Sequence, residues 1–425
     1  MKLTYKFRMS RTRHLDVLCS ISKKLYNQAN WYIRQDFFHL ENWLRYQDLN
    51  FILKNSNHYK LLKTQTSQQI LKILDKNWKS FFNAIKERKK DKKKFNGRPR
   101  PPKYKKNCRN LLIFTNQNSK IKDNVITLTM SRMFKEIFPE FGNPLKITIP
   151  KYKNRSFEDY QQICILPRKK FHDVEIVYNK EIEKSKLEQN YYLSIDFGLN
   201  NLITIVENQN SKPIIISGKL LKSINRQWNK QKAKLYSIKD KQKLKWTDRL
   251  DKITIKRNSV LKDYLHKTAQ FIVGYCLKNQ IGNICLGELK GIKQNIRMGK
   301  QNNQNFVNVP IQTLKQRIAY KAQLVGIKVH KVDESYTSKC SSLDLEAIQK
   351  YKKYFGKRIK RGLFQGSNYI LNADVNGALN ILRKVVGDGF IQNLSDRGCW
   401  FQPVQIRDMF QTSHEQFLTK SVNIS

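Results

Sequence analysis

The sequence predicts a mixed fold class, in which an α/β domain follows an all-β domain that carries an inserted group of helices. Apolar and polar residues alternate in the first nine residues and again between residues 110 and 178. Between residues 15 and 85 apolar residues recur three and four apart, and after residue 191 strands alternate with helices. With 425 residues the chain is too long for one ordinary core, so about two to three domains are expected.

The charge of the chain indicates a polyanionic partner. The chain has 82 Lys and Arg against 33 Asp and Glu, a net charge of +49. This exceeds what solubility requires and attracts nucleic acid. Binding to a membrane surface is the alternative, but no run of about 18 apolar residues is present to span a bilayer.

The cysteines indicate an intracellular protein. The seven are scattered, and no signal peptide precedes them, so a disulfide framework is not expected. We therefore expect a cytoplasmic, nucleoid-associated protein without a membrane partner.

The first part of the chain combines a small all-β domain with helices. Met1–Met9 reads as a strand, and helical spacing follows over residues 15–44 and 67–85. Trp78 lies on the apolar stripe and is expected in the core, although it could instead stack on a base. Short runs such as "VITLTM" and "VEIVY" predict a small barrel or sandwich that includes the opening strand, with the helices as an insertion.

Residues 86–109 form a basic segment with thirteen Lys and Arg against two acidic residues. Prolines at 99, 101 and 102 prevent a continuing helix, so an extended strap is expected, with a disordered linker as the alternative. Its lysines and arginines would attract phosphate, and its aromatic residues could stack on unpaired bases. The candidate nucleic-acid-binding residues are Lys89, Lys90, Lys92, Lys93, Lys94, Arg98, Arg100, Lys103 and Tyr104.

The second part of the chain predicts an α/β domain. Strands are expected at "YYLSIDF", "NLITIV" and "KPIIIS", followed by a Lys-rich helical region over residues 219–278. A strand at "NICLGEL", a helix after Pro310, a strand at "IKVHKVD" and a helix at "NADVNGALNILRKV" complete the series. This order matches the ribonuclease H type of fold, a mixed sheet that opens with an antiparallel hairpin and continues through right-handed crossovers.

Three carboxylates stand at the ends of elements that this topology brings together. Asp196 ends the first strand, Glu288 ends the fourth, and Asp374 opens the last helix. Each alone has an ordinary explanation, such as a turn residue or a first-turn acid favoured by the helix dipole. Together, in a chain so poor in acids, they indicate a metal site, because converging carboxylates need a cation to stay ionised. Mg²⁺, which prefers carboxylate oxygens, is the expected ion, as two ions that bridge a scissile phosphate.

At these residues the sequence resembles the TnpB family, the RNA-guided nucleases of bacterial insertion sequences and relatives of the type V CRISPR effectors. The resemblance lies in "LSIDFGLNNLITI", "ICLGEL", "ESYTSKCSSLD", "GKRIKRGLF" and "NADVNGALNIL", and upstream in "QQILKILDKNWKSFF" and "GRPRPPKYKK". It extends over nearly the whole chain to about Val386, and the block around Asp374 is its most specific part.

The resemblance implies a RuvC-like, divalent-metal-dependent DNA endonuclease, with Asp196, Glu288 and Asp374 as catalytic and metal-binding residues and Mg²⁺ or Mn²⁺ as the ion. Its implied partners are a guide RNA from the element end and a double-stranded DNA target, with sequence read by base pairing. The implied domains are a wedge β-barrel (1–10 and 110–188), a helical recognition lobe with the basic strap (11–109), the RuvC-like nuclease domain (189–336 and 372–386), a degenerate zinc-ribbon-like insert (337–371) and a tail (387–425).

One departure from the family concerns zinc. Typical members carry a four-cysteine zinc ribbon between the second and third acidic motifs, whereas here Cys340 stands alone. One thiolate cannot make a structural zinc site, so no zinc is predicted and the insert is expected to pack without metal. Arg358 and Arg361 in its basic patch are further candidates to bind nucleic acid, although such a run is more often a solvated face.

Two other functions remain open from the sequence. A strand-transferring transposase would use the same fold and the same carboxylates. A non-cleaving, RNA-guided DNA-binding regulator would be expected to lack acidic ligands, and all three are present here. The tail after Gly387 suggests no function.

Overall fold

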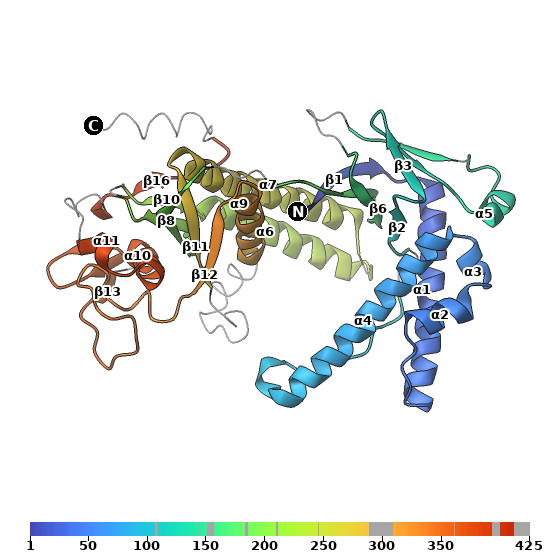
Figure 1. Ribbon diagram of the computed structural model, residues 1–425, viewed down its shortest axis with the longest axis horizontal. Helices are drawn as coiled ribbons and strands as arrows, with labels where there is room; N and C mark the ends of the chain where they lie inside the picture. The colour runs from blue at the N-terminus through green and yellow to red at the C-terminus, as the bar shows by residue number, and fades with distance from the viewer. Residues whose placement is uncertain are drawn as a thin grey trace. The chain divides into compact units, whose positions relative to one another are not determined.

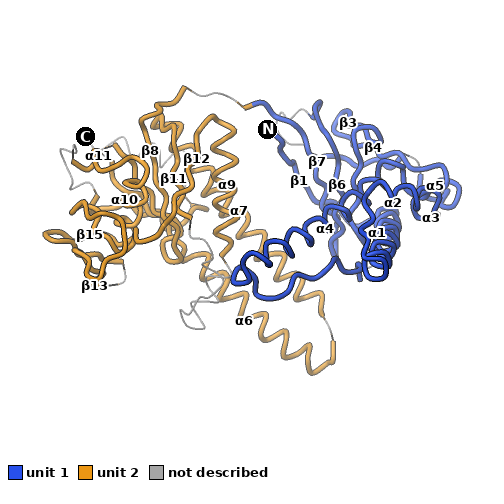
Figure 2. The backbone as a smooth tube through the Cα atoms, turned by 60° about the horizontal axis from the view of Figure 1, so that its bottom comes forward, with its two compact units in different colours: residues 1–181 blue, residues 182–425 orange. Residues whose placement is uncertain are grey.

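The computed structural model describes residues 1–106, 109–142, 144–150, 157–182, 186–209, 211–244, 246–288, 309–360, 362–392 and 400–411 (Figure 1). The chain forms two compact units, Met1–Glu181 and Ile182–Ser425 (Figure 2). No helix in the described ranges is both long and apolar enough to cross a membrane.

The first unit contains two antiparallel sheets. The four-stranded sheet has the order β1 (Lys2–Ser10), β7 (Phe171–Asn179), β6 (Tyr160–Pro167), β2 (Leu112–Thr115). The three-stranded sheet consists of β3 (Ser119–Lys122), β4 (Val125–Leu128) and β5 (Leu145–Thr148). Because the opening strand pairs with β7 along its whole length, the predicted insertion of the helices between strands of one sheet is confirmed.

The inserted helices share one core with these sheets. The long helices are α1 (Arg13–His39) and α4 (Thr64–Lys90), with α2 (Tyr46–Leu53), α3 (Asn57–Lys60) and α5 (Arg132–Ile137) as shorter ones. The Thr12 side chain caps α1 by accepting from the Leu15 N–H, which satisfies one free donor of its first turn. Trp78 on α4 is fully buried and donates from its indole N–H to Asn30, so its predicted core position is confirmed.

The basic strap leaves the end of α4 as a 3₁₀ turn, Lys92–Lys94, and then runs extended up to residue 106. Asn30 and Arg34 on α1 donate to the carbonyl of Pro102, and Asn27 forms two hydrogen bonds with the backbone of Lys105. Prolines supply no backbone donor of their own, and here the carbonyl of Pro102 is held by side chains of a neighbouring helix. In the described residues the strap is therefore a fixed extended segment, not a disordered linker.

The second unit is built on one six-stranded sheet in the order β12 (Lys328–Asp333), β11 (Ile281–Glu288), β8 (Glu188–Phe197), β9 (Asn201–Glu207), β10 (Ile214–Ser217), β16 (Val404–Ile406). Strands β8, β9 and β10 are antiparallel, whereas β11 and β12 run parallel to β8. The predicted mixed sheet, which opens with an antiparallel hairpin and continues through helical crossovers, is confirmed by this order.

Helices cover both faces of the sheet, which explains why its strands read as nearly continuous apolar runs. The crossover helices α7 (Asp248–Lys278) and α9 (Ile311–Leu324) share a core with one face. Helix α10 (Ala373–Val386) shares a core with the other face, which includes Cys285 and Val332. The predicted Lys-rich helical region is two helices, α6 (Lys219–Lys241) and α7, joined by a turn.

Two small features follow from no pattern in the sequence. The segment before α10 forms a three-stranded sheet of β13 (Lys357–Lys360), β14 (Leu363–Gln365) and β15 (Ile370–Asn372). In the tail, after the short helix α11 (Gly389–Gln392), β16 adds a parallel strand beside β10 and Trp400 is fully buried. At least this part of the tail belongs to the domain.

Candidate active site and nucleic-acid interface

Asp196 lies near the end of β8, on the sheet face that α10 covers. Ser194, two residues earlier on the same face, donates from its hydroxyl to the Ala378 carbonyl of that helix. A Cβ at Gly377 would come within 3.0 Å of the Asp196 carboxylate, so the glycine lets the helix backbone approach the acid closely. The Asp196 carboxylate near the end of the apolar strand β8 therefore lies against the first turns of α10.

Asp374 stands in the first turn of that helix. The Asn372 side chain caps α10 by accepting from the backbone N–H groups of Asp374 and Val375, which fixes the turn. The Asp374 carboxylate accepts from the Asn201 amide at 2.6 Å and from the Arg358 guanidinium at 3.3 Å. The structure thus brings Asp196 and Asp374 together, as their positions at the ends of neighbouring elements of the expected topology predicted.

Glu288 is not brought to them. Successive residues of a strand point to opposite faces, so Glu288 follows the face of Leu286, which packs with α7 and α9, and not that of Cys285, which packs with α10. The Glu288 carboxylate lies 3.6 Å from Lys331 and lines a small pocket with Gln312 and Gln316 of α9. About 29% of its side chain is exposed to solvent.

Glu334, which the sequence analysis did not single out, occupies the place expected for a third acid. It directly follows β12, and its carboxylate lies over Gly287, where a Cβ would overlap it. Thr337 donates to the Glu334 carbonyl, and Lys384 of α10 donates to the carbonyls of the adjacent Asp333 and Ser335. The sequence offered one signal, because Glu334 directly follows the predicted strand "IKVHKVD", which lies next to the strand that carries Glu288.

The electrostatics support one acidic site made of Asp196, Glu334 and Asp374. Desolvation, followed by the charges of Glu334 and Asp374, raises the pKa of Asp196 to about 8. Desolvation also raises the pKa of Glu334, against the lowering effect of Lys315, with smaller raising contributions from Asp333 and Glu288. Like charges that interact this strongly are costly to ionise together, and a cation removes that cost.

Two basic side chains lie against these acids. The ammonium of Lys315 on α9 lies 3.6 Å from a Glu334 oxygen and 4.6 Å from the centre of the Phe197 ring, and it donates to the Gly287 carbonyl. Arg358 on β13 pairs with Asp374. Within the described ranges, no three His, Cys, Asp or Glu side chains converge closely enough to hold a metal ion as they stand. The carboxylate oxygens of the acidic site are nevertheless the hard donors that Mg²⁺ accepts.

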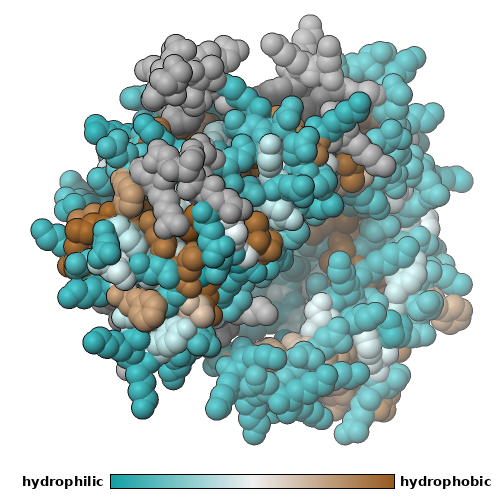
Figure 3. All heavy atoms as spheres, turned by 60° about the vertical axis from the view of Figure 1, so that its left-hand side comes forward, coloured by the Kyte–Doolittle hydropathy of each residue, from teal (hydrophilic) through white to brown (hydrophobic). Residues whose placement is uncertain are grey.

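The nine candidate residues of the strap are all solvent-exposed. Arg34 of α1 stacks over the rings of Phe38 and Tyr104, at 5.1 and 5.5 Å, and these rings are 54% and 41% exposed. A guanidinium held between two exposed rings is suited to stacking on unpaired bases. Arg361, the other candidate of the insert beside Arg358, lies outside the described residues. The face of the molecule drawn in Figure 3 is largely hydrophilic, in line with the composition.

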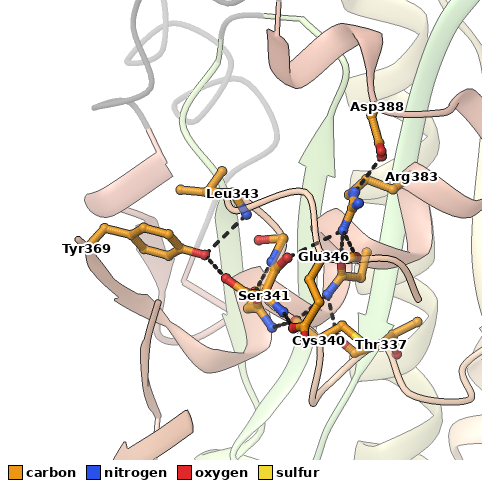
Figure 4. Close-up of polar contacts among 11 residues, drawn as sticks. Thr337, Cys340, Ser341, Leu343, Glu346, Tyr369, Arg383 and Asp388 are labelled. Carbon is orange, nitrogen blue, oxygen red and sulfur yellow. Dashed lines mark hydrogen bonds and ion pairs between the residues drawn. The ribbon is translucent and has the colours of Figure 1, made fainter. Parts of the chain in front are cut away.

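Between β12 and α10 the insert is held by a polar cluster, which we define as Glu346, Asn376, Asn380 and Arg383. Figure 4 labels Glu346 and Arg383 among its contacts. The buried Glu346 carboxylate accepts from the backbone N–H groups of Ser341 and Phe355. Arg383 donates to the Glu346 carbonyl, to the Asn380 side chain and to Asp388. Asn376 and Asn380 donate to the Cys340 carbonyl.

The lone cysteine of the insert is a buried thiol in this cluster. Cys340 lies with its Sγ 3.6 Å from the Gln349 carbonyl, and desolvation raises its pKa. A protonated thiol is not a zinc ligand. Beside it the Tyr369 hydroxyl contacts the Ser341 hydroxyl and accepts from the Leu343 N–H. Hydrogen bonds between side chains and backbone therefore cross-link this segment where a zinc ribbon would use thiolates.

Two family models match this chain, and both matches lie almost entirely within the second unit. Residues 175–293 match a family described as probable transposase, OrfB_IS605, and residues 312–381 match the Cas12f1-like TNB domain. The two matches flank residues 294–311, and together they include Asp196, Glu334 and Asp374.

Curated relatives and one solved structure extend the likeness over the chain. The TnpB-like protein ORF457 of Acidianus two-tailed virus is 26% identical over 88% of this chain and 84% of its own. The TnpB-like protein MJ0751 of Methanocaldococcus jannaschii is 24% identical over 54% of this chain and 79% of its own. The fold resembles that in a Cas12f1–sgRNA–target DNA complex, with a TM-score of 0.57, 16% identity, and coverage of 87% of this chain and 83% of that one.

Proposed function

Because this chain belongs to the TnpB family, we propose that it is an RNA-guided endonuclease that hydrolyses phosphodiester bonds of target DNA. Its catalytic domain would be RuvC-like and comprise residues 189–336 and 372–386. The observation that carries the proposal is the acidic site, in which Asp196, Glu334 and Asp374 come from three separate elements and the charges of Glu334 and Asp374 add to desolvation in raising the pKa of Asp196. Nothing in the packing of the sheet requires such an arrangement.

The acidic site fits a divalent cation by its donor chemistry, since hard carboxylate oxygens suit Mg²⁺ or Mn²⁺. Asp196, Glu334 and Asp374 would hold it, with Glu288 at the rim as the alternative third acid. Bound there as a pair of ions, the metal would supply an activated water and stabilise the leaving 3′ oxygen.

The remaining contacts of the site position its acids. Asn201 fixes one oxygen of Asp374, which leaves the other to the exposed Arg358 guanidinium. Lys315 holds Glu334 from the side of α9. Arg358 carries its charge on a hairpin beside the acids, and a guanidinium there would pair with a DNA phosphate that enters the site.

The first unit would hold the nucleic acids. We assign it the role of wedge domain and recognition lobe, with the exposed strap residues taking phosphates of a guide RNA and of double-stranded DNA. The rings of Phe38 and Tyr104 with Arg34 between them would receive an unpaired base.

The experiment is cleavage of a plasmid library by the protein co-expressed with its native flanking transcript, with Mg²⁺ or with EDTA. Guide-dependent and Mg²⁺-dependent cutting is expected. The Asp196→Ala variant should lose more than ~100-fold in cleavage activity, because changing even a hydrogen-bond partner of a metal ligand lowers metal affinity or activity by ~10–100-fold. An RNA-loaded wild type that binds its target but never cuts would favour the binding-regulator function and contradict the proposal.

Strand transfer is the second candidate, because one matching family is described as a probable transposase. It would use the same acids, so variants of the acidic site do not separate the two functions. Sequencing of the products does: joined ends would indicate transfer, and free ends indicate hydrolysis.

A further inference from the structure

The hairpin of α6 and α7 is the most strongly basic part of the second unit that the acidic site does not use. Between Lys219 and Arg257 it carries fourteen Lys and Arg against three Asp. The two helices lie side by side and extend beyond the sheet (Figure 2). Like charges spaced along a helix repel one another, so a polyanion bound along this segment would reduce their repulsion.

Aromatic rings and cations alternate along this hairpin. Trp228, Lys232 and Tyr236 are spaced four apart on α6, and the Lys232 ammonium lies 4.9 Å from the ring centre of Trp228 and 5.2 Å from that of Tyr236. The Arg257 guanidinium of α7 lies 5.0 Å from the ring centre of Trp228, and the Lys239 ammonium lies 5.0 Å from that of Tyr236. We call these five residues, with Trp246 at the turn, the cation–aromatic ladder.

The ladder ends in an exposed tryptophan with a fixed orientation. Trp246 packs edge-on against Tyr236, with ring centres 6.1 Å apart, and its indole N–H donates to the Asp251 carboxylate at 2.7 Å. Even so, 40% of the residue is exposed, and Leu244 and Ile238 of the same hairpin are 45% and 44% exposed. A ring held by its N–H with its surface open to solvent is a preformed stacking surface.

We propose that the tip of this hairpin binds the guide RNA at unpaired loop nucleotides, an inference that rests on the proposed function. Trp246 would stack on a base, and Lys232 would take a flanking phosphate, whereas Lys239 is already paired with Asp240 at 2.6 Å. Positive charge with interleaved aromatic rings suits unpaired nucleotides, because each base offers a π-face and each phosphate a charge. Loops of a structured RNA present such bases, whereas the bases of a duplex remain stacked.

The test measures affinity of the full-length protein for three labelled probes without any cleavage step. The probes are an RNA hairpin with a ten-adenosine loop, a blunt RNA duplex of equal length, and single-stranded deoxyadenosine of the loop length. Trp246→Ala is expected to weaken binding of the hairpin about tenfold, the usual cost of one lost stacking contact, and to leave the duplex unaffected. Trp246→Phe should retain most of the affinity, and Leu244→Ala, equally exposed at the same tip, should bind as the wild type does.

Lys232 gives a second, independent readout. The variant Lys232→Gln should weaken both RNA probes and lower the slope of log affinity against log salt by about one unit, whereas Trp246→Ala should leave that slope unchanged. Equal weakening of hairpin and duplex by Trp246→Ala, or no weakening, would overturn the proposal. A loss confined to the DNA probe would overturn it in favour of a displaced DNA strand. Because no probe is cut, failure here is distinguishable from failure of the nuclease assignment.

Discussion

Helix α10 contributes to two polar clusters with opposite electrostatics. In the polar cluster the buried carboxylate of Glu346 and the guanidinium of Arg383 have hydrogen-bond partners on several sides. In the acidic site the charges of Glu334 and Asp374 add to desolvation, and the pKa of Asp196 rises to about 8. The first arrangement stabilises the fold because its buried groups are satisfied. The second makes ionisation of Asp196 costly, an arrangement that is typical of functional sites.

The largest expected effect comes from breaking the satisfied cluster. Arg383→Met would leave the Glu346 carbonyl, the Asn380 amide oxygen and Asp388 without their donor, so we expect a loss of about 2–4 kcal/mol in the free energy of unfolding. Urea unfolding measures it. The control is Asp388→Asn, which changes only the half-exposed partner and should cost under about 1 kcal/mol. Equal effects of the two variants would show that the cluster is not a unit.

A smaller effect is expected from relieving the acidic site. The folded pKa of Asp196 is raised from 3.8 to about 8, so the folded protein binds more protons than the unfolded chain between those values. The associated stability is fully present below pH 3.8 and is lost as pH rises through about 8. In EDTA, the urea midpoint of Asp196→Asn should therefore exceed that of the wild type by more at pH 8 than at pH 5. A pH-independent difference would contradict this.

The smallest expected effect is that of a zinc chelator. Because hydrogen bonds hold the insert, treatment of the purified protein with a zinc chelator should leave its thermal midpoint unchanged. Zinc analysis should give well under one equivalent per chain. A zinc content near one equivalent, or a lowered midpoint after chelation, would show that the insert is a metal site and that the polar cluster is not its substitute.

The sequence predicted the parts of the fold that rest on local pattern. The main strands and helices followed from periodicity, and the order along the chain suggested that the first strand joins the later strands, although its partner β7 came only from the structure. Strand β16 did not follow from periodicity, since three residues carry no readable period. The polar cluster did not either, because the hydrogen bonds of Asn376 and Asn380 to the insert join residues 34 to 43 positions apart, such as Asn380 and Thr337.

The candidate site was predicted in two of its three acids. Asp196 and Asp374 were found because each stands at the end of an element whose position the topology fixes. The identity of the third acid depended on which residues of β11 point toward α10, because a shift of one residue moves a side chain to the other face of a sheet. In "CLGEL" the sequence cannot tell whether residue 287 or 288 faces α10; the structure places Gly287 there and fills the space above it with Glu334.

The central claim is that Glu334, and not Glu288, completes the acidic site, and one pair of isosteric variants tests it directly. Guide-loaded Glu334→Gln and Glu288→Gln would be compared with the wild type in single-turnover cleavage of a target plasmid, after RNA binding has been shown to be equal in all three. Glu334→Gln is expected to lose more than ~100-fold in rate, and Glu288→Gln to stay within about fivefold, as for a half-exposed ion pair. Full activity in Glu334→Gln together with loss of activity in Glu288→Gln would contradict the claim.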